Sequence, residues 1–273
     1  MSLLDEILAR KRAELASGRA PGLAPELADA VARLGPRAIP RVEAILARRA
    51  GAPLRLMAEV KFASPSAGSL SRKLDAGERA LAYAAAGASL VSVLCDATFF
   101  GGGYGDLARA RLALEATGRA APILAKEFVV DPLQLDWARA CGADAALLIA
   151  RVLPPRVLVD LSNHARAIGL EPLVEVSTEA ERDAALEAGA RVVGVNARDL
   201  DTLEMDADRA ARILAGVPSG CVAVHLSGLA SPAAVQEVAR GRADAALIGE
   251  ALMREDDPGP LLGSMLSAAG WSG

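Results

Sequence analysis

Acidic and basic side chains recur at the ends of short apolar runs in this sequence. The polar residues at these ends are Glu59, Lys61, Lys126, Glu175 and Asn196. A strand can end in Glu or Lys simply to reach water. Ionisable groups held close together also shift each other's pKa values, as general acid–base catalysis near neutral pH requires. Because the groups recur at four separate ends, the pattern favours an enzyme that moves protons on a bound substrate.

Aromatic residues gather after the first three of these runs. Only 3% of the residues are aromatic, yet all four phenylalanines follow those runs, with one tyrosine close by. They are Phe62, Phe99, Phe100, Phe128 and Tyr104. Such residues can simply pack over loops. Alternatively, they form a flat apolar pocket, which we expect to bind an aromatic ring.

Glycine-bearing turns follow the last two runs, at Ser227-Gly228 and Gly249-Glu250. Backbone amides at such turns, next to the start of a helix, bind phosphate groups. Together with the aromatic residues, the turns predict a substrate in which a phosphorylated sugar is joined to an aromatic ring. The acid–base groups would lie between the two ends of that substrate.

Eight apolar runs must position these side chains, and stretches of helical length separate them. The predicted strands cover residues 54–60, 89–94, 122–125, 145–149, 172–176, 192–195, 222–226 and 245–248. Strands that alternate with helices are typical of parallel βαβ construction. We therefore predict an α/β fold, a (β/α)8 barrel over residues 51–273, in which catalytic groups lie at the carboxyl ends of the strands.

A doubly wound open sheet is the alternative to the barrel. That fold normally carries a glycine-rich phosphate loop after its first strand. Here the first predicted strand is followed by Lys61-Phe62-Ala63-Ser64-Pro65-Ser66 instead. The sequence therefore favours the barrel.

The first 50 residues form a separate N-terminal extension with a different pattern. It predicts helices over about 3–17 and 38–50, with glycine- and proline-bearing segments between them. Arg and Lys residues are frequent in these helices. Such charges usually mark a solvated helix face.

Composition excludes several classes of partner. The chain has 30 Lys and Arg against 34 Asp and Glu, and a pI near 5.4, which argues against nucleic acid or an anionic membrane as the main partner. It contains no apolar run of about 18 residues or more, and its start lacks the apolar core of a signal peptide. The three cysteines are too far apart for a disulfide framework or a zinc site. We expect a cytoplasmic protein with no bound metal.

Several motifs follow one another along the chain. They are Ala58-Glu59-Val60-Lys61 with Ala63-Ser64-Pro65-Ser66, Ser92-Val93-Leu94 with Phe99-Phe100-Gly101-Gly102, Lys126 with Phe128 and Asp131, Glu171-Pro172-Leu173-Val174-Glu175, and Gly194-Val195-Asn196-Ala197-Arg198-Asp199-Leu200. In type and order this set resembles the indole-3-glycerol phosphate synthase family of tryptophan biosynthesis. The N-terminal extension is also similar to the family's, in which an extra helix helps to cover the barrel mouth.

The resemblance implies a ring closure that needs no cofactor. The substrate would be 1-(2-carboxyphenylamino)-1-deoxyribulose 5-phosphate, and the products indole-3-glycerol phosphate, carbon dioxide and water. Lys126 would be the general acid that protonates the ribulose carbonyl oxygen and then helps to expel hydroxide. Lys61 would pair with an anionic group of the substrate. Glu59 and Glu175 would handle protons during condensation and dehydration, with the division of steps between them left open.

The resemblance also implies roles for residues that orient and bind the substrate. Asn196 would orient it. Ser227, grouped with the catalytic residues, would bind phosphate together with Gly228, Gly249 and Glu250, mainly through backbone amides. The remaining implied substrate-binding residues are Ser64, Phe100, Phe128 and Arg198. Of these, the two phenylalanines would flank the ring and the arginine would contact an anion.

One departure from the family concerns the end of the seventh predicted strand. The family normally has Glu-Ser-Gly there, with the glutamate among the catalytic groups, whereas this chain has Leu226-Ser227-Gly228. Loss of an acid–base carboxylate costs about 10²–10⁴-fold in rate. His225 is no simple replacement, because alternation sends it to the helix side if Leu226 points inward; we expect it to be buried with a hydrogen-bond partner. Glu250 and Glu127 are candidates for a compensating carboxylate.

Three functions therefore stay open at this point. The first is the synthase itself, which the survival of the other polar groups favours. The others are a non-catalytic binding or regulatory relative, and an enzyme acting on a related aryl-amino ribulose phosphate. In each case we expect a small phosphorylated ligand, no nucleic-acid or membrane partner, and a monomer or weak oligomer.

Overall fold

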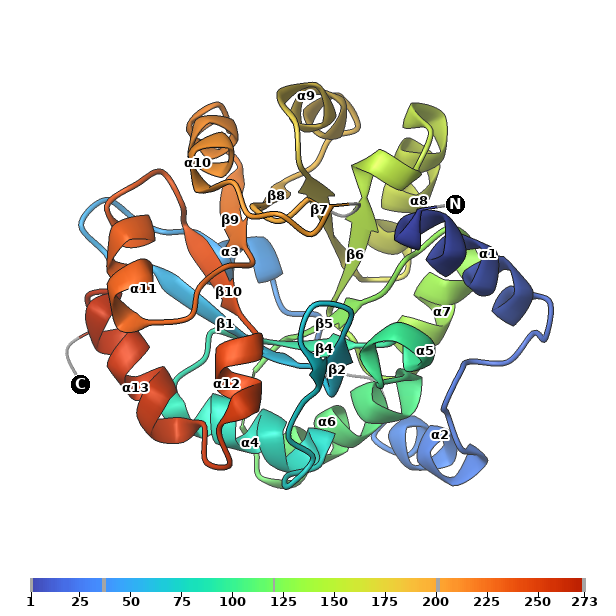
Figure 1. The fold of residues 1–273 in the computed structure, drawn as a ribbon. Coiled ribbons are helices and arrows are strands. Elements are labelled where there is room, and N and C mark those ends of the chain that lie inside the picture. Colours follow the sequence, from blue (N-terminus) through green and yellow to red (C-terminus); the bar gives the residue numbers. More distant parts are fainter. Residues whose placement is uncertain (1, 36–37, 120, 200–201, 272–273) are drawn as a thin grey trace.

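A closed barrel of eight parallel strands forms the centre of the protein (Figure 1). The computed structural model describes residues 2–35, 38–119, 121–199 and 202–271. The strands are β1 (Arg55–Val60), β4 (Leu90–Leu94), β5 (Ile123–Lys126), β6 (Ala145–Ile149), β7 (Glu171–Val176), β8 (Val192–Asn196), β9 (Val222–Leu226) and β10 (Ala245–Ile248). Strand β10 pairs with β1 and closes the barrel. All eight predicted strands are confirmed to within one residue at either end.

Helices follow each strand and form the outer ring. They are α4 (Ala76–Ala86), α6 (Tyr104–Ala116), α7 (Pro132–Ala140), α8 (Pro155–Ala167), α9 (Glu179–Glu187), α10 (Ala207–Ala215), α11 (Pro232–Ala239) and α13 (Gly259–Ala268). Two of them, α4 and α7, begin with capping boxes at Asp75 and Asp131. In each box the aspartate side chain accepts a backbone N–H of the first helical turn. The side chain three residues later accepts the backbone N–H of the aspartate. The predicted (β/α)8 barrel is thereby confirmed.

Short elements in the loops at the carboxyl ends of the strands were not foreseen. They are the hairpin β2 (Ala63–Ser64) and β3 (Gly68–Ser69), the helices α5 (Ala97–Phe100) and α12 (Glu250–Arg254), and the 3-10 turn η1 (Ala150–Val152). Each follows a barrel strand directly or within three residues. These elements therefore lie at the end of the barrel where the predicted site lies.

Two buried layers hold the barrel together. One lies between the strands and the outer helices, and the other fills the interior. Strand residues in the interior layer include Met57, Leu90, Leu124, Leu147, Leu173, Val192, Val224, Leu226 and Leu247. Because successive side chains of a strand point to opposite faces, Leu226 lies inside the barrel and its neighbour His225 outside that layer.

The N-terminal extension forms three helices, α1 (Leu3–Leu15), α2 (Pro25–Ala32) and α3 (Val42–Leu46). Helix α1 lies at the barrel mouth, where Leu4 and Ile7 join the interior layer. Helix α3 reaches the same layer from the opposite end of the barrel through Val42 and Leu46. The extension therefore packs against the interior layer at both ends of the barrel.

The predicted helix over 38–50 is wrong in its length. Helix α3 covers only five residues, because the chain becomes extended at Ala47 (ψ 135°). Arg48 then donates from its side chain to the carbonyl oxygens of Ala52 and Ala239, at 2.7 and 2.8 Å. The bond to Ala239 is a tertiary contact, and it overrides the local helical pattern. Helix α2 was missed, although Pro25 at its first position is a recognised start signal.

None of the helices in the described ranges combines the length and the apolar character needed to cross a membrane.

Candidate active site

A cavity of about 840 Å³ opens at the carboxyl ends of the barrel strands. All of the residues predicted for catalysis or substrate binding line it: Glu59, Lys61, Ser64, Phe100, Lys126, Phe128, Glu175, Asn196, Arg198, Ser227, Gly228, Gly249 and Glu250. The volume lies within the range of small-molecule sites in enzymes. The structure thus brings together residues that are up to 191 positions apart in the chain (250 − 59).

A lysine at the end of β5 and a glutamate near the end of β7 face each other in this cavity. Lys126 Nζ lies 3.5 Å from Oε2 of Glu175. The other oxygen of Glu175 accepts a hydrogen bond of 2.9 Å from Nδ2 of Asn196. Glu175 is buried, with 2% of its surface exposed. Asn196 therefore holds the carboxylate in an orientation that presents Oε2 to the lysine.

Charge keeps Lys126 protonated despite its burial. Burial alone lowers the pKa of Lys126, but the carboxylates of Glu175 and Glu59 outweigh it, so the pKa lies above the usual value for lysine. A lysine in this state is a proton donor over the whole physiological pH range. Lys126 can therefore act as a general acid toward a substrate oxygen.

Glu59 and Lys61 form a second ion pair at the end of β1. Lys61 Nζ lies 3.2 Å from Oε1 of Glu59, as expected for side chains two apart on one strand face. Ser92 on the neighbouring strand donates to the other oxygen of Glu59 at 3.4 Å. At Gly249 an added Cβ would lie only 2.6 Å from Oε1 of Glu59. The glycine therefore leaves the space that this carboxylate occupies.

The turn after β9 places two consecutive residues in the left-handed region. Ser227 has φ 72° and Gly228 has φ 83°. Ser227 is not glycine, so this conformation is strained and needs support from its surroundings. Its hydroxyl donates to Oδ1 of Asn196 at 2.8 Å, and the backbone N–H of Arg198 donates to the same hydroxyl at 3.2 Å. Such a turn exposes backbone amides that can bind an anion.

His225 supports the turn from the helix side, as expected. Its exposed fraction is 6%, and Nε2 lies 3.0 Å from the carbonyl oxygen of Ser227. Because a carbonyl oxygen only accepts, Nε2 carries the proton. Burial lowers the pKa of His225, against the opposing effect of this bond. The neutral histidine therefore fixes the backbone of the strained serine.

Leu226 occupies the position at which the resembled family normally has a glutamate. It packs in the interior layer, and an added Cβ on Gly194 would lie 2.7 Å from its Cδ1 atom. The two candidate replacements are both engaged elsewhere. Glu250 forms an ion pair with Arg254 at 2.7 Å, and Glu127 forms one with Lys11 at 3.1 Å. The carboxylates that act on Lys126 are those of Glu175 and Glu59.

Two of the five aromatic residues considered in the sequence form the apolar side of the cavity. The rings of Phe100 and Phe128 lie 6.0 Å apart between centroids and are inclined by 32°. Phe62 instead packs between the barrel and its helices under Arg72, and Tyr104 packs there against Trp137. Phe99 packs against the interior layer without lining the cavity, so the expectation that all five gather in one pocket is wrong for Phe62, Phe99 and Tyr104.

Residues of the loop after β8 also line the cavity and were not foreseen. Leu203 and Met205 belong to this loop. The side chain of Arg198 donates to the carbonyl oxygen of Leu203 at 3.0 Å. The methyl group of Met205 lies 2.3 Å from where a Cβ of Gly228 would be. The loop thus lies directly over the turn at Ser227, but no periodic pattern in the sequence marks it.

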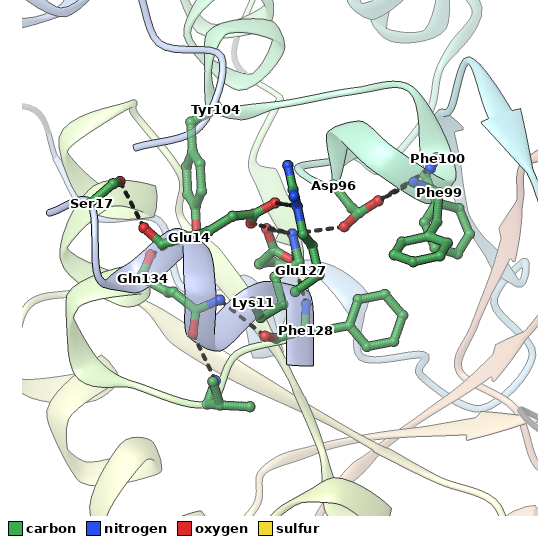
Figure 2. Close-up of polar contacts among 12 residues, drawn as sticks. Lys11, Glu14, Ser17, Asp96, Phe99, Phe100, Tyr104, Glu127, Phe128 and Gln134 are labelled. Atoms are coloured by element: carbon green, nitrogen blue, oxygen red, sulfur yellow. Dashed lines mark hydrogen bonds and ion pairs between the residues drawn. The ribbon is translucent and has the colours of Figure 1, made fainter. Parts of the chain in front are cut away.

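A buried lysine next to the cavity is the main feature that sequence reasoning missed. Lys11 is only 1% exposed, and Nζ lies 2.7 Å from Asp96 and 3.1 Å from Glu127 and Glu14 (Figure 2). Burial raises the pKa of Glu127 to about 7, while Lys11 opposes the shift. The expectation of solvated charges on the N-terminal helices is wrong here. The signal was available, since Leu4, Ile7 and Lys11 share one face of a helix.

Among the residues with described positions, no three His, Cys, Asp or Glu side chains are arranged to hold a metal ion.

Comparison with known proteins agrees with this geometry. A family model described as indole-3-glycerol phosphate synthase matches residues 4–262. The chain belongs to the indole-3-glycerol phosphate synthase family. A family member from Mycobacteroides abscessus, called indole-3-glycerol phosphate synthase, is 40% identical over 268 residues, covering 98% of this chain and 94% of that protein. One of the same name from Mycobacterium leprae is 40% identical over 267 residues, with the same coverage.

Solved structures outside the indole-3-glycerol phosphate synthase family share the fold. The tryptophan synthase alpha subunit of Legionella pneumophila aligns with a TM-score of 0.62 at 15% identity, covering 85% of this chain and 99% of that one. A 3-hexulose-6-phosphate synthase aligns with a TM-score of 0.60 at 16% identity, covering 79% and 99%. At such identities the likeness shows the barrel fold alone.

Proposed function

We propose that this protein is an indole-3-glycerol phosphate synthase. It would convert 1-(2-carboxyphenylamino)-1-deoxyribulose 5-phosphate to indole-3-glycerol phosphate, carbon dioxide and water, without a cofactor. The observation that carries the proposal is the position of protonated Lys126, 3.5 Å from Glu175. Together with Asn196 this pair lies in one cavity with two phenylalanine rings and the strained turn after β9. Membership of the family supports the same reaction.

Lys126 is the proposed general acid. It gives a proton to the carbonyl oxygen of the ribulose chain when the new carbon–carbon bond forms, and carbon dioxide then leaves the ring. In the dehydration that follows, the same group helps the hydroxyl to leave as water. Lys126 must be reprotonated between these steps, and Glu175, which lies 3.5 Å from Nζ, can pass on to it the proton that this carboxylate accepts from the substrate.

Glu59 and Glu175 are the proposed proton acceptors. Asn196 fixes Glu175, while Lys61 and Ser92 fix Glu59. Each carboxylate thus has one oxygen held by a neutral hydrogen-bond donor. Neither carboxylate can rotate freely, and this restriction favours proton transfer in a defined direction.

The phosphate group of the substrate is proposed to bind at the turns after β9 and β10. Ser227 and Gly228 form the first of these turns, and Gly249 and Glu250 the second. Backbone amides would make the contacts, because the Glu250 carboxylate is paired with Arg254. Two further residues that line the cavity are proposed as substrate contacts, Ser64 in the hairpin over the mouth and Arg198 as the partner of an anionic group.

Turnover of the substrate by the purified protein, followed by the fluorescence of the indole product, tests the proposal. We expect saturable turnover, and a loss of about 10²–10⁴-fold in Lys126→Met. The control is Lys73→Met, which removes an exposed lysine paired with Asp256 and leaves turnover unchanged. If the protein bound a reduced substrate analogue but did not turn over the substrate, the proposed enzymatic function would be wrong. That result would indicate a binding relative or one with a different aryl-amino substrate.

Three further properties belong to the same proposal. Residues 1–50 act as an extension that covers the mouth of a barrel domain spanning 51–273. The protein works in the cytoplasm as a monomer or weak oligomer. Sedimentation of the purified chain at several concentrations tests the last point.

A further inference from the structure

One buried cation joins the N-terminal helix to two loops of the candidate site. Lys11 reaches down from α1 between Asp96, which follows β4, and Glu127, which follows β5 (Figure 2). The exposed fractions of the three side chains are between 0 and 1%. Its remaining partner, Glu14, comes from the same helix. Lys11 is thus the link through which α1 holds both loops.

Each of the two carboxylates also holds the backbone of an aromatic residue of the cavity. Asp96 accepts hydrogen bonds through Oδ1 from the N–H groups of Phe99 and Phe100, at 2.7 and 3.2 Å. Glu127 accepts one through Oε1 from the N–H of Phe128, at 2.7 Å. The carboxylates therefore lie between the lysine and the two rings, one on each side.

The rings of Phe100 and Phe128 together line the apolar side of the cavity. The backbone of Phe128 is held from its other side as well, because Gln134 donates to its carbonyl oxygen at 3.0 Å. Movement of Glu127 or Asp96 would be passed directly to the ring attached to it. The two carboxylates thus hold the backbones of Phe100 and Phe128, whose ring centroids lie 6.0 Å apart.

The ammonium group of Lys11 stabilises the close approach of the two ionised carboxylates. Two buried carboxylates that share one site repel each other, and one of them takes up a proton when no positive charge lies between them. Removal of one partner from a buried ion pair is costly for the same reason. Without Lys11 the two loops would therefore move apart or change their hydrogen bonds.

We propose that Lys11 is a positioning residue that sets the spacing of Phe100 and Phe128 for the planar aromatic end of the substrate. It touches no substrate atom and acts through Asp96 and Glu127. The identity of the aromatic substrate rests on the function proposed above. The spacing itself follows from the contacts of these residues. In this arrangement the N-terminal helix shapes the aromatic subsite as well as covering it.

The first test compares Lys11→Met with wild type in turnover and thermal unfolding at pH 8, where Glu127 is ionised. The matched control is Arg111→Met, which removes a buried cation from Asp144 at the other end of the barrel. We expect both variants to lose stability. Lys11→Met alone should raise KM about tenfold or more, since small displacements of binding groups have large effects. A KM within twofold of wild type would overturn the proposal.

The second test measures binding of two fragments by calorimetry and needs no turnover. 2-Aminobenzoate probes the aromatic end and glycerol 3-phosphate the phosphate end. We expect Lys11→Met to weaken only the aromatic fragment, whereas partial unfolding would weaken both equally and overturn the positioning role. An inactive wild type would contradict the proposed reaction and leave this comparison intact.

Lys11→Arg serves if the methionine variant does not fold. The guanidinium keeps the charge but is larger, so we expect a near-normal unfolding temperature together with a KM above that of wild type. An arginine variant with normal stability and unchanged KM would show that the spacing of the two rings does not depend on Lys11.

Discussion

The carboxylate of Glu59 lies against the backbone of Gly249 so closely that a side chain at position 249 has no room. An added Cβ would be 2.6 Å from Oε1 and 3.3 Å from the carboxyl carbon. The same Oε1 atom pairs with Lys61 at 3.2 Å. A glycine at the end of β10 thus determines where Glu59, the proposed proton acceptor at the end of β1, can lie.

Gly249→Ala should therefore displace Glu59 from Lys61. We expect kcat/KM to fall about tenfold or more, because the reacting groups lose their alignment. Gly263→Ala is the control, since Gly263 lies within helix α13 with nothing within 4 Å of an added Cβ. That change should leave activity intact. Equal kinetics for the two variants would contradict the role of the close approach.

Glu175→Gln should change the pH dependence of the residual activity. Glu175 raises the pKa of Lys126, which burial lowers, so removing the charge brings this pKa down. Lys126 must be protonated to act as an acid, and its activity falls as the pH rises through its pKa. The alkaline limb of kcat should thus move to lower pH, and the rate should drop about 10²–10⁴-fold.

Profiles of kcat between pH 7 and 11 measure this shift. Glu171→Gln is a matched control on the same strand, because Glu171 lies at the amino end of β7 and pairs with Arg191. Its alkaline limb should match that of wild type. If the limb of the Glu175 variant also stays in place, Glu175 does not control the charge of Lys126.

His225→Gln should alter the acid side of the stability profile. Burial lowers the pKa of His225 in the folded protein below the usual 6.5. As the pH falls below 6.5, the unfolded chain takes up this proton first, so the free energy of unfolding decreases by at most about 1.4 kcal/mol per pH unit. The glutamine can still donate to Ser227 but does not titrate. Urea unfolding between pH 5 and 8 should show a shallower slope for the variant; parallel curves would contradict this.

Leu226→Glu should exchange stability for activity. The change removes a buried leucine from the interior layer, at a cost of about 2–3 kcal/mol. It also places a carboxylate at a position that lines the cavity. We expect kcat to rise about tenfold, which is less than the roughly 10²–10⁴-fold contributed by a well-placed acid–base group. Leu226→Gln has the same length without the charge and should lose stability with no gain in rate.

Most of the fold could be predicted because its signals are local. Each strand is an apolar run that is buried on both sides, and a helix of ordinary composition follows it. The site could be predicted from the same information, because the topology brings every strand end to one mouth. Glu59 and Asn196 could be assigned to this mouth from their positions at strand ends alone, without knowing which residues they contact.

The missed features depend on partners distant in the chain. Helix α3 ends early because Arg48 bonds to Ala239, and Lys11 is buried because Glu127, 116 residues away, accepts its charge. The spacing of Leu4, Ile7 and Lys11 marks one buried helix face, but nothing local identifies the carboxylates that Lys11 meets there. Tyr104 was misplaced for the same reason, since its burial against Trp137 is a tertiary contact.

The link between Lys11 and the loop after β5 also fixes an order of events during synthesis on the ribosome. Helix α1 leaves the exit tunnel long before its anchor, because Glu127 follows Lys11 by 116 residues. A chain emerges at about 5–20 residues per second, so the helix waits for about 6–23 seconds with its lysine in water. Helix α1 is therefore made first but docks at the barrel mouth only after the later strands have been made.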